Sequence, residues 1–417
     1  MEADCILTNC KLAHQTELVS VFISKGVFVD FKPKSEVRSD DLVGLKVIDI
    51  KGQLMLPSLI ETHIHLDKAC IFSQCVVKEG TLSEAIEQTS KAKRQFTYED
   101  VYLRGKAVLE KAIRQGTGHM RTHVEVDPIV GLVSFDAIQQ LKYDYAWAIT
   151  IEICVFPQEG LNNHEGTFEL LEQALKKGAD VLGGCPYTDS DPYNQIQTLF
   201  QLAKKYDVDL DFHLDFDLDK DNMSLPDVIK FTDEYCYAGR VTVGHVTKLS
   251  ALPYDDLVVI ANKMAQSGVA LTTLPSTDLF LVGREYQHNI PRGVLPLKQL
   301  SKAGVCCSIS TNNINNPFTP YGDCSQVRQA NLYANVAQLA TPEDLSSCFN
   351  WVSSESAKLL RKQGYGIDIG NDADVIFFDA NESFEVIGNI ELPKMGMKKG
   401  VITFTRPETS IHYPTNQ

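Results

Sequence analysis

The sequence predicts an α/β protein in which a (β/α)8 barrel, of the TIM-barrel type, carries a small β-sandwich domain formed by the N- and C-terminal segments. Three observations lead to this prediction. Short apolar strands alternate with helical patterns through the middle of the chain, strand-like segments occupy both ends, and histidines recur where the barrel strands are expected to end. The 417 residues are enough for one large barrel with an appended domain.

The two ends of the chain share a strand-rich pattern. The first fifty residues alternate β-branched and aromatic residues between glycine-containing turns, and ADVIFFDA (373–380) and KKGVITFTRP (398–407) have the same pattern. A domain that is interrupted by an insertion brings its two ends together. We therefore expect residues 1–55 and 366–417 to form one β-domain, and residues 56–365 to form the barrel.

The middle of the chain has the rhythm of strand–helix units. Eight apolar segments are predicted to be strands, near residues 53, 118, 146, 179, 208, 240, 268 and 304. After the first pair they are spaced by about 30 residues, the length of one such unit. Helical patterns such as 167–178, 196–207 and 296–304 fill the gaps and end in basic residues and a breaker. The alternative is an open doubly wound sheet, but the first strand is not followed by a glycine-rich phosphate turn.

The composition indicates which kinds of partner the protein can bind and in which compartment it lies. The chain has 54 acidic and 39 basic residues and a formal charge of −15, which repels nucleic acid and anionic membranes. It lacks an apolar run of the roughly 18 residues that a membrane helix needs, and its acidic start is unlike a signal peptide. The eleven cysteines form no CxxC pair, which is typical of reduced thiols. We expect a cytoplasmic protein that acts on a small molecule, with no nucleic-acid or membrane partner.

Five of the ten histidines fall at predicted strand ends, where barrel enzymes place their reactive groups. His63 and His65 end the first strand, and residues two apart on a strand face the same way, so both can bind one metal ion. His123 lies on strand two, His213 on strand five and His245 on strand six. Three imidazoles and an open position match a catalytic zinc site, and iron(II) also accepts nitrogen ligands. We expect one divalent metal ion, Zn2+ or Fe2+; a structural barrel with core histidines, in which His123 is only a hydrogen-bonded core residue, is an alternative.

Several segments resemble the amidohydrolase superfamily and, within it, the cytosine deaminase-like branch. The chain is similar also to triazine N-alkylamidohydrolases of the N-isopropylammelide isopropylamidohydrolase type. The resemblance spans nearly the whole chain. Its segments are LPSLIETHIHLDK (56–68), RTHVEVD (121–127), VFPQEG (155–160), DFHLDFD (211–217), VGHVT (243–247), NNINNPF (312–318) and ADVIFFDA (373–380).

The resemblance implies roles for residues on these segments. His63, His65 and His213 look like the metal ligands, and His245 looks like the histidine that contacts the hydrolytic water or the substrate. Gln158 resembles the glutamine that hydrogen-bonds the amide edge of the heterocycle.

Three further residues are candidates for the site. Lys68 matches a lysine three residues after the HxH motif in relatives that act on other amines. His123 and, more weakly, Asp189 are further candidates for substrate contact.

Two family carboxylates are replaced in this chain. Asn312 stands where the family has an aspartate at the end of strand eight, and Phe216 stands where cytosine deaminases have a glutamate. Asn312 can offer a weak oxygen ligand, but an amide accepts no proton near neutral pH. General acid–base help is worth about 10²–10⁴ in rate. Asp217, like Asp215, shares the face of His213 if the strand stays extended.

Either aspartate can supply the missing proton transfer, as can His245 or Lys68. A carboxylate that only orients a ligand histidine is the alternative for both aspartates.

The leading hypothesis is a metal-dependent hydrolase, of deaminase or amidohydrolase type, that cleaves a non-peptide C–N bond in a small cyclic amidine or amide. Phe216 disfavours cytosine itself as the substrate. The alternative is a catalytically impaired barrel that binds a small heterocyclic ligand. The segment 274–284 is expected to cover the pocket in the way that the resemblance implies, and the alternative is that its Asp278 and Arg284 pair with solvent or with each other. A homo-oligomer is also possible.

Overall fold

The eight predicted barrel strands are present and form one parallel sheet in the computed structural model, which describes residues 3–412. Neighbours in the sheet are in chain order, from the first strand to the last. The strands are β6 Leu59–Ile64, β7 Thr117–Glu125, β8 Thr150–Phe156, β9 Val181–Gly184, β10 Asp209–Leu214, β11 Val241–His245, β12 Val269–Thr273 and β13 Cys307–Ile309.

The barrel closes between its first and last strands around Asn312. The Asn312 backbone N–H donates to His63 O at 2.8 Å, and the His65 N–H donates to Asn312 O at 2.9 Å. The Thr62 N–H donates to Ser310 Oγ at 2.8 Å just below. The backbone of Asn312 is therefore fixed beside both histidines of the HxH motif, and the predicted (β/α)8 barrel is confirmed.

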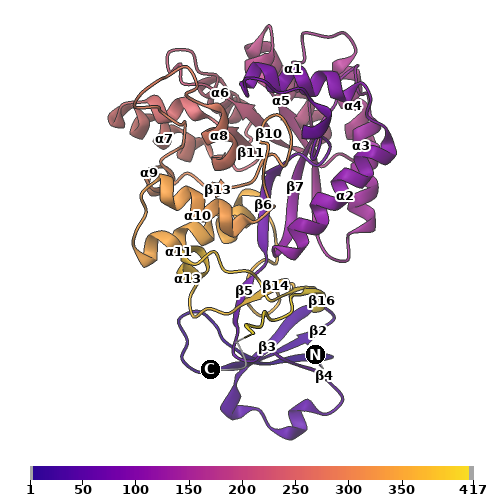
Figure 1. Ribbon diagram of the computed structural model, residues 1–417, viewed down its shortest axis with the longest axis vertical. Coiled ribbons are helices and arrows are strands. Elements are labelled where there is room, and N and C mark those ends of the chain that lie inside the picture. The colour runs from indigo at the N-terminus through magenta and orange to yellow at the C-terminus, as the bar shows by residue number, and fades with distance from the viewer. Residues whose placement is uncertain (1–2, 413–417) are drawn as a thin grey trace.

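Helices cover the outside of the barrel (Figure 1). Some of them begin at residues whose side chains cap them: Thr97 accepts from Asp100 N at the start of α2, and Asp191 accepts from Asn194 N at the start of α5. The helices are α1 Leu82–Lys93, α2 Tyr98–Arg114, α3 Val133–Asp144, α4 Thr167–Lys176, α5 Pro192–Tyr206, α6 Leu225–Glu234, α7 Tyr254–Ser267, α8 Pro275–Leu281, α9 Leu297–Lys302, α10 Gln326–Val336, α11 Pro342–Asn350, α12 Ser354–Leu359 and α13 Ser383–Gly388.

The remaining strands come from the first and last parts of residues 3–412 and form a β-sandwich below the barrel (Figure 1). One four-stranded sheet has the order β3-β2-β1-β4 and the other the order β16-β15-β14-β5. Leu7 and Phe28 of the first sheet share a buried core with Met55 and Phe377 of the second. The strands are β1 Cys5–Cys10, β2 Val19–Ser24, β3 Val27–Pro33, β4 Lys46–Asp49, β5 Leu54–Pro57, β14 Val375–Phe378, β15 Met395–Lys398 and β16 Val401–Thr405. The predicted sandwich from both chain ends is confirmed.

The segment near residue 53, predicted as the single first barrel strand, is two strands in different sheets. β5 pairs with β14 in the sandwich, and β6 pairs with β7 in the barrel. Ser58 lies between them and donates its N–H to Asp374 O, where the two parts meet. Among residues 3–412, no helix combines the length and the apolar character required to cross a bilayer.

Candidate active site

Three predicted ligands meet at the upper end of the barrel, where the strands finish. His63 lies on β6, His65 comes directly after that strand, and His213 lies on β10. His213 Nε2 is 3.0 Å from His63 Nε2 and 3.0 Å from His65 Nε2. All three side chains are buried, with exposed fractions of 0–2%. Strands four places apart in the sheet have therefore been brought together by the curvature of the barrel.

This group of nitrogens fits a metal ion. Among residues 3–412, Nδ1 of each of the three rings has no hydrogen-bond partner, and the three Nε2 atoms face one another. Burial, reinforced by the neighbouring rings, lowers the pKa of His63, His65 and His213 well below the usual value for histidine. The rings are thus neutral at pH 7, which is the form that binds metal. Their ligand atoms lie close enough together to hold one ion.

A glycine leaves room for the first ligand ring. Gly244, on β11, lies against the ring of His63, and a Cβ added there would be 3.1 Å from His63 Cε1 and Nδ1. Any other residue would therefore press on this ring.

His245 and Asn312 lie beside the three histidines at positions of unusual backbone conformation. Their φ angles are +67°, and that of Val246 is +50°. Such conformations cost of order 1–3 kcal/mol for non-glycine residues and cluster at functional sites. The His245 Nε2 lies 3.3 Å from Asn312 Nδ2, and Asn312 Oδ1 has no hydrogen-bond partner in the described part of the chain. The Asn312 oxygen is therefore available to a ligand.

Asp278 is a site residue that sequence reasoning missed. Its Oδ1 lies 2.7 Å from His245 Nδ1, and its side chain is fully buried on α8. Burial raises the pKa of the Asp278 carboxyl, although the bond to His245 opposes this shift. The alternative, in which Asp278 pairs with solvent or with Arg284, is wrong, because Asp278 is buried and Arg284 donates to the backbone oxygens of Phe280 and Glu79. Asp278 and His245 are 33 positions apart in the chain, so no local sequence pattern indicated their contact.

Lys68 and Gln158 form a second polar group that is almost completely buried. Lys68 Nζ donates to Glu125 Oε1 at 2.7 Å and to Gln158 Oε1 at 3.0 Å, and it lies 4.5 Å from the centre of the Phe318 ring. The Gln158 amide nitrogen donates to Cys185 Sγ at 3.4 Å. The oxygen and the nitrogen of the Gln158 amide are therefore both hydrogen-bonded to other residues of the protein. Lys68 supplies the positive charge of this polar group.

A further buried lysine, Lys93, was also missed by sequence reasoning. Its Nζ lies 2.6 Å from carboxylates of both Asp127 and Glu159 and 3.2 Å from Glu125. Burial alone would raise the pKa of Glu125, but the ammonium groups of Lys68 and Lys93 outweigh it and lower that pKa to about 2. Two lysines and three carboxylates thus form one charged network beside the histidines.

His123 lies one layer below the strand ends. β7 continues two residues beyond it, and its ring stacks on His63 with centres 3.8 Å apart. His123 Nε2 is 3.4 Å from Asp211 Oδ1, and Arg121 donates to the other oxygen of Asp211 at 3.0 Å. His63, His123 and Asp211 are spaced closely enough for a metal ion, but they share His63 with the first group.

The structure does not bring Asp217 or Asp189 to the histidines. β10 ends at Leu214, and Asp215 has a φ of +49°, so the extended geometry expected for Asp215 and Asp217 is absent. Asp217 is 53% exposed and pairs with Lys248 at 3.3 Å.

Asp215 and Asp189 bind backbone groups of their own loops. Asp215 accepts from the N–H groups of Ser224 and Leu225 at the start of α6. Asp189 accepts from the N–H groups of Leu161, Asn162 and Asp191, which ties two loops together.

An apolar cluster around Phe216 lies beside His245. Phe216 packs against His245, with ring centres 3.9 Å apart, and belongs to a buried cluster with Leu281 and Phe318. Phe216 also lines a cavity of about 430 Å³, together with residues 81–83 and 281–285. Phe216 therefore contacts both the ring of His245 and this cavity.

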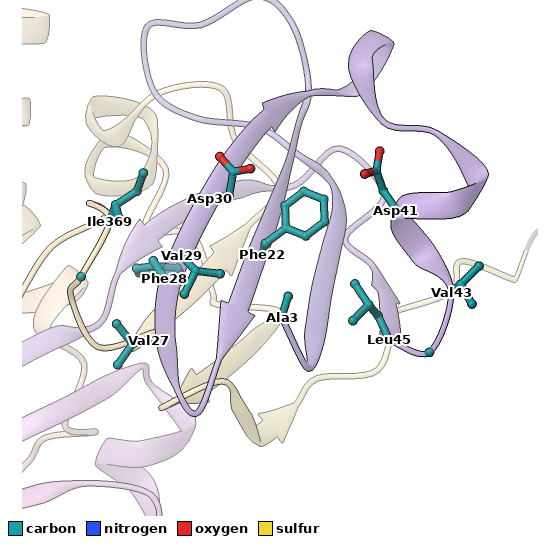
Figure 2. Close-up of a pocket in the computed structure, with 12 residues that line it drawn as sticks. Ala3, Phe22, Val27, Phe28, Val29, Asp30, Asp41, Val43, Leu45 and Ile369 are labelled. Carbon is teal, nitrogen blue, oxygen red and sulfur yellow. The ribbon is translucent and has the colours of Figure 1, made fainter. Parts of the chain in front are cut away.

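A separate pocket lies in the β-domain, away from the histidines. Figure 2 shows the apolar side chains of Phe22, Val29 and Leu45 around it, with the carboxylates of Asp30 and Asp41. Its volume is about 690 Å³, and its lining holds no histidine, cysteine or lysine. Size alone thus does not identify the reactive site.

Comparisons with known proteins agree with this geometry. The model of the Amidohydrolase family matches residues 147–387, more than half of the chain. An N-isopropylammelide isopropyl amidohydrolase of Pseudomonas sp. (strain ADP) is 26% identical over 90% of this chain and 91% of its own. A pterin deaminase of Rhizobium rhizogenes is 23% identical over 92% of this chain and 87% of its own. The solved structure of a 5-methylcytosine deaminase from Klebsiella pneumoniae, liganded with 5-fluorocytosine, is 26% identical and superposes with a TM-score of 0.92 over 99% of this chain and 100% of that chain.

Proposed function

Because this chain belongs to the amidohydrolase family, as its sequence segments indicated, we propose that it is a metal-dependent hydrolase that cleaves a non-peptide C–N bond in a small cyclic amidine or amide. The observation that carries the proposal is the convergence of three neutral, buried imidazoles on one point at the strand ends. Structural histidines in a core would instead pair with protein donors and acceptors.

His63, His65 and His213 would hold one divalent cation, Zn2+ or Fe2+, and Asn312 Oδ1 would be a fourth contact. Such a cation supplies Lewis-acid chemistry that polarises the scissile carbon and activates water. The protein supplies the enclosed site, because the apolar cluster around Phe216 excludes bulk water.

Lys68 and the aromatic rings would bind the heterocycle. The Lys68 ammonium is fixed by Glu125 and Gln158, which leaves one N–H for a ring oxygen or nitrogen. Gln158 would act through Lys68, because its own amide is engaged. Phe216 and Phe318 offer apolar faces to a planar ring.

Metal content and amine release test this function. We expect purified protein loaded with zinc or iron to hold one ion per chain and to release ammonia or an alkylamine from at least one member of a panel of heterocyclic amines and amides. The change His213→Ala should lower metal affinity at least about 100-fold, because it removes a direct ligand. His288→Ala, at an exposed histidine, is the matched control. The proposal is refuted if the native protein binds no stoichiometric metal, or if it releases no amine from any member of the panel.

The second candidate is a barrel that binds a heterocycle without turning it over, which the amide of Asn312 and the ring of Phe216 favour. Asn312→Asp separates the two. An added negative charge among the ligands should tighten metal binding in either case. If the native protein is active and the variant is slower, the site works with its amide. Activity that appears only in the variant would favour the binding protein.

A further inference from the structure

An apolar groove lies on the outside of the barrel between α6 and α7, and none of its lining residues belongs to the candidate active site. Its volume is about 370 Å³. Pro226 and Ile229 of α6 line one part of it, and Val259 and Ile260 of α7 line another. Figure 1 shows α7 at the outer edge of the barrel. Val259 is 55% exposed, so the groove is open to a partner from solution.

The outer face of α7 carries two apolar residues between two opposite charges. Four lining residues share this side of the helix, because they are spaced by three, one and three positions: Asp256, Val259, Ile260 and Lys263. Asp256 and Lys263 are two turns, about 10.5 Å, apart along the axis. Among residues 3–412, neither of them forms an ion pair or a side-chain hydrogen bond. Each charge is therefore available to a partner.

This order of side chains is complementary to itself. When a second copy of α7 lies antiparallel to the first about a two-fold axis, the same surface is used by both copies. The axis passes between Val259 and Ile260, because these positions lie midway between Asp256 and Lys263. Asp256 of each copy then faces Lys263 of the other copy, and the apolar residues pack on one another at the centre.

The charge of the groove favours a second copy over a partner of one sign. The chain has a formal charge of −15, so two copies repel each other over most of their surfaces. The groove differs, because two lysines, Lys230 and Lys263, line it with one carboxylate, Asp256. An acidic helix would place a carboxylate against Asp256, and a basic helix would place an ammonium group against Lys263. The same face from a second copy pairs both charges.

We propose that the protein forms a symmetric homodimer in which two α7 helices pack antiparallel across this groove. The interface holds two pairs of Asp256 with Lys263, around a centre of Val259 and Ile260. The dimer is independent of the proposed hydrolase function, because no residue of the candidate active site lines the groove. Interfaces of standard size range from micromolar to picomolar affinity. A single pair of helices is smaller than such an interface, so we expect a Kd in the micromolar range.

Reversal of either charge tests the pairing without a change in the core. We expect sedimentation velocity of the native protein at micromolar concentrations to show a monomer–dimer equilibrium. Asp256→Lys places lysine against lysine at both ends of the interface, and Lys263→Asp places aspartate against aspartate. Each change should raise the Kd at least about tenfold, because it turns two attractions into two repulsions.

An equimolar mixture of the two variants should dimerise about as tightly as the native protein, because each lysine then faces an aspartate again. The mixture also separates the loss of pairing from a loss of helix stability, since it contains the same two altered chains. Glu87→Lys is the matched control, because it makes the same change of charge at an exposed carboxylate of α1, outside the groove. Its Kd should equal that of the native protein.

Three results would overturn the proposal. A native protein that stays monomeric leaves the groove to a partner of another chemistry. A dimer that neither reversal weakens is held together by another face of the molecule. Reversals that the mixture does not rescue show that Asp256 and Lys263 do not face each other across the interface.

Discussion

At the scale of single residues, the proposed metal site depends on Gly244, which has no side chain to press on a ligand ring. Gly244 faces the ring of His63 from β11, and both ring atoms nearest to it would be 3.1 Å from an added Cβ. Ligand rings are held by contacts outside the metal's own shell, and altering such contacts costs about 10–100-fold in metal affinity. A methyl group added at Gly244 is therefore expected to change the metal affinity through the ring of His63, without contacting the ion itself.

We expect Gly244→Ala to weaken zinc affinity by about 10–100-fold, because His63 must tilt to make room. The φ of Gly244 is outside the left-handed region, so the backbone accepts alanine without strain. Competition with a chromophoric chelator measures the affinity, and urea unfolding of the metal-free protein measures stability. Native affinity in a folded variant would show that the ring of His63 has room to spare.

From the sequence, we could predict those site residues that are close neighbours in the chain or that occupy the strand-end position used by barrel enzymes. His63 and His65 share a strand face, and His213 shares the strand-end position that barrels use. Asp278 could not be predicted, because its contact with His245 depends on how α8 folds back after β12. His123 was predicted to lie at the end of its strand, but β7 continues to Glu125, and the sequence does not show where this strand ends.

At the scale of elements, the residue at which a strand ends determines where the next side chains point. The expectation for Asp217 assumed that β10 stays extended, whereas the backbone turns left-handed at Asp215. The turn lets the Asp215 carboxylate bind the first N–H groups of α6, which have no partner within the helix. Asp215 therefore binds the start of α6 and does not contact the three histidines.

Lys93, the last residue of α1, is a buried lysine close to the candidate active site. Lys93 is 1% exposed and contacts carboxylates of Asp127, Glu159 and Glu125. We expect Lys93→Met to lower the free energy of unfolding by about 3–5 kcal/mol, because it leaves buried carboxylates without their cation. Urea unfolding at pH 7 measures this change.

Lys91→Met is the matched control within the same helix. Lys91 is 60% exposed, and its one ion pair with a described residue is that with Glu87, so we expect its removal to change stability by less than about 0.5 kcal/mol. Equal losses in the two variants would mean that the buried network contributes nothing beyond a surface pair.

At the scale of the whole molecule, the two parts of the fold could be predicted from patterns that repeat. Eight strand–helix units predicted the barrel, and similar strands at both ends predicted the sandwich. The way the parts join was not predictable, because Ser58 and Asp374 meet across more than 300 residues of chain. Close to this contact, at the start of β7, the ring of His119 lies against Asp374 at 3.2 Å, and Lys398 pairs with the same carboxylate at 3.0 Å.

This junction makes the stability of the protein depend on pH. Burial lowers the pKa of His119 to about 4; the bond to Asp374 opposes that shift, while Lys398 and Lys362 add to it. The unfolded chain has the ordinary histidine pKa of about 6.5. Between these values the unfolded chain binds a proton that the folded protein excludes, so the free energy of unfolding falls as the pH falls. The loss is about 1.4 kcal/mol per pH unit, or about 2 kcal/mol between pH 7.5 and pH 5.

The change His119→Gln should remove this part of the acid sensitivity, because glutamine keeps an N–H donor for Asp374 but does not titrate. We expect the free energy of unfolding of the native protein, minus that of the variant, to decrease by about 2 kcal/mol from pH 7.5 to pH 5. Urea unfolding at both values measures the difference, in which the titration of all other groups cancels. A difference that is constant with pH would show that His119 titrates in the folded protein as it does in the unfolded chain, and that the junction admits water to its ring.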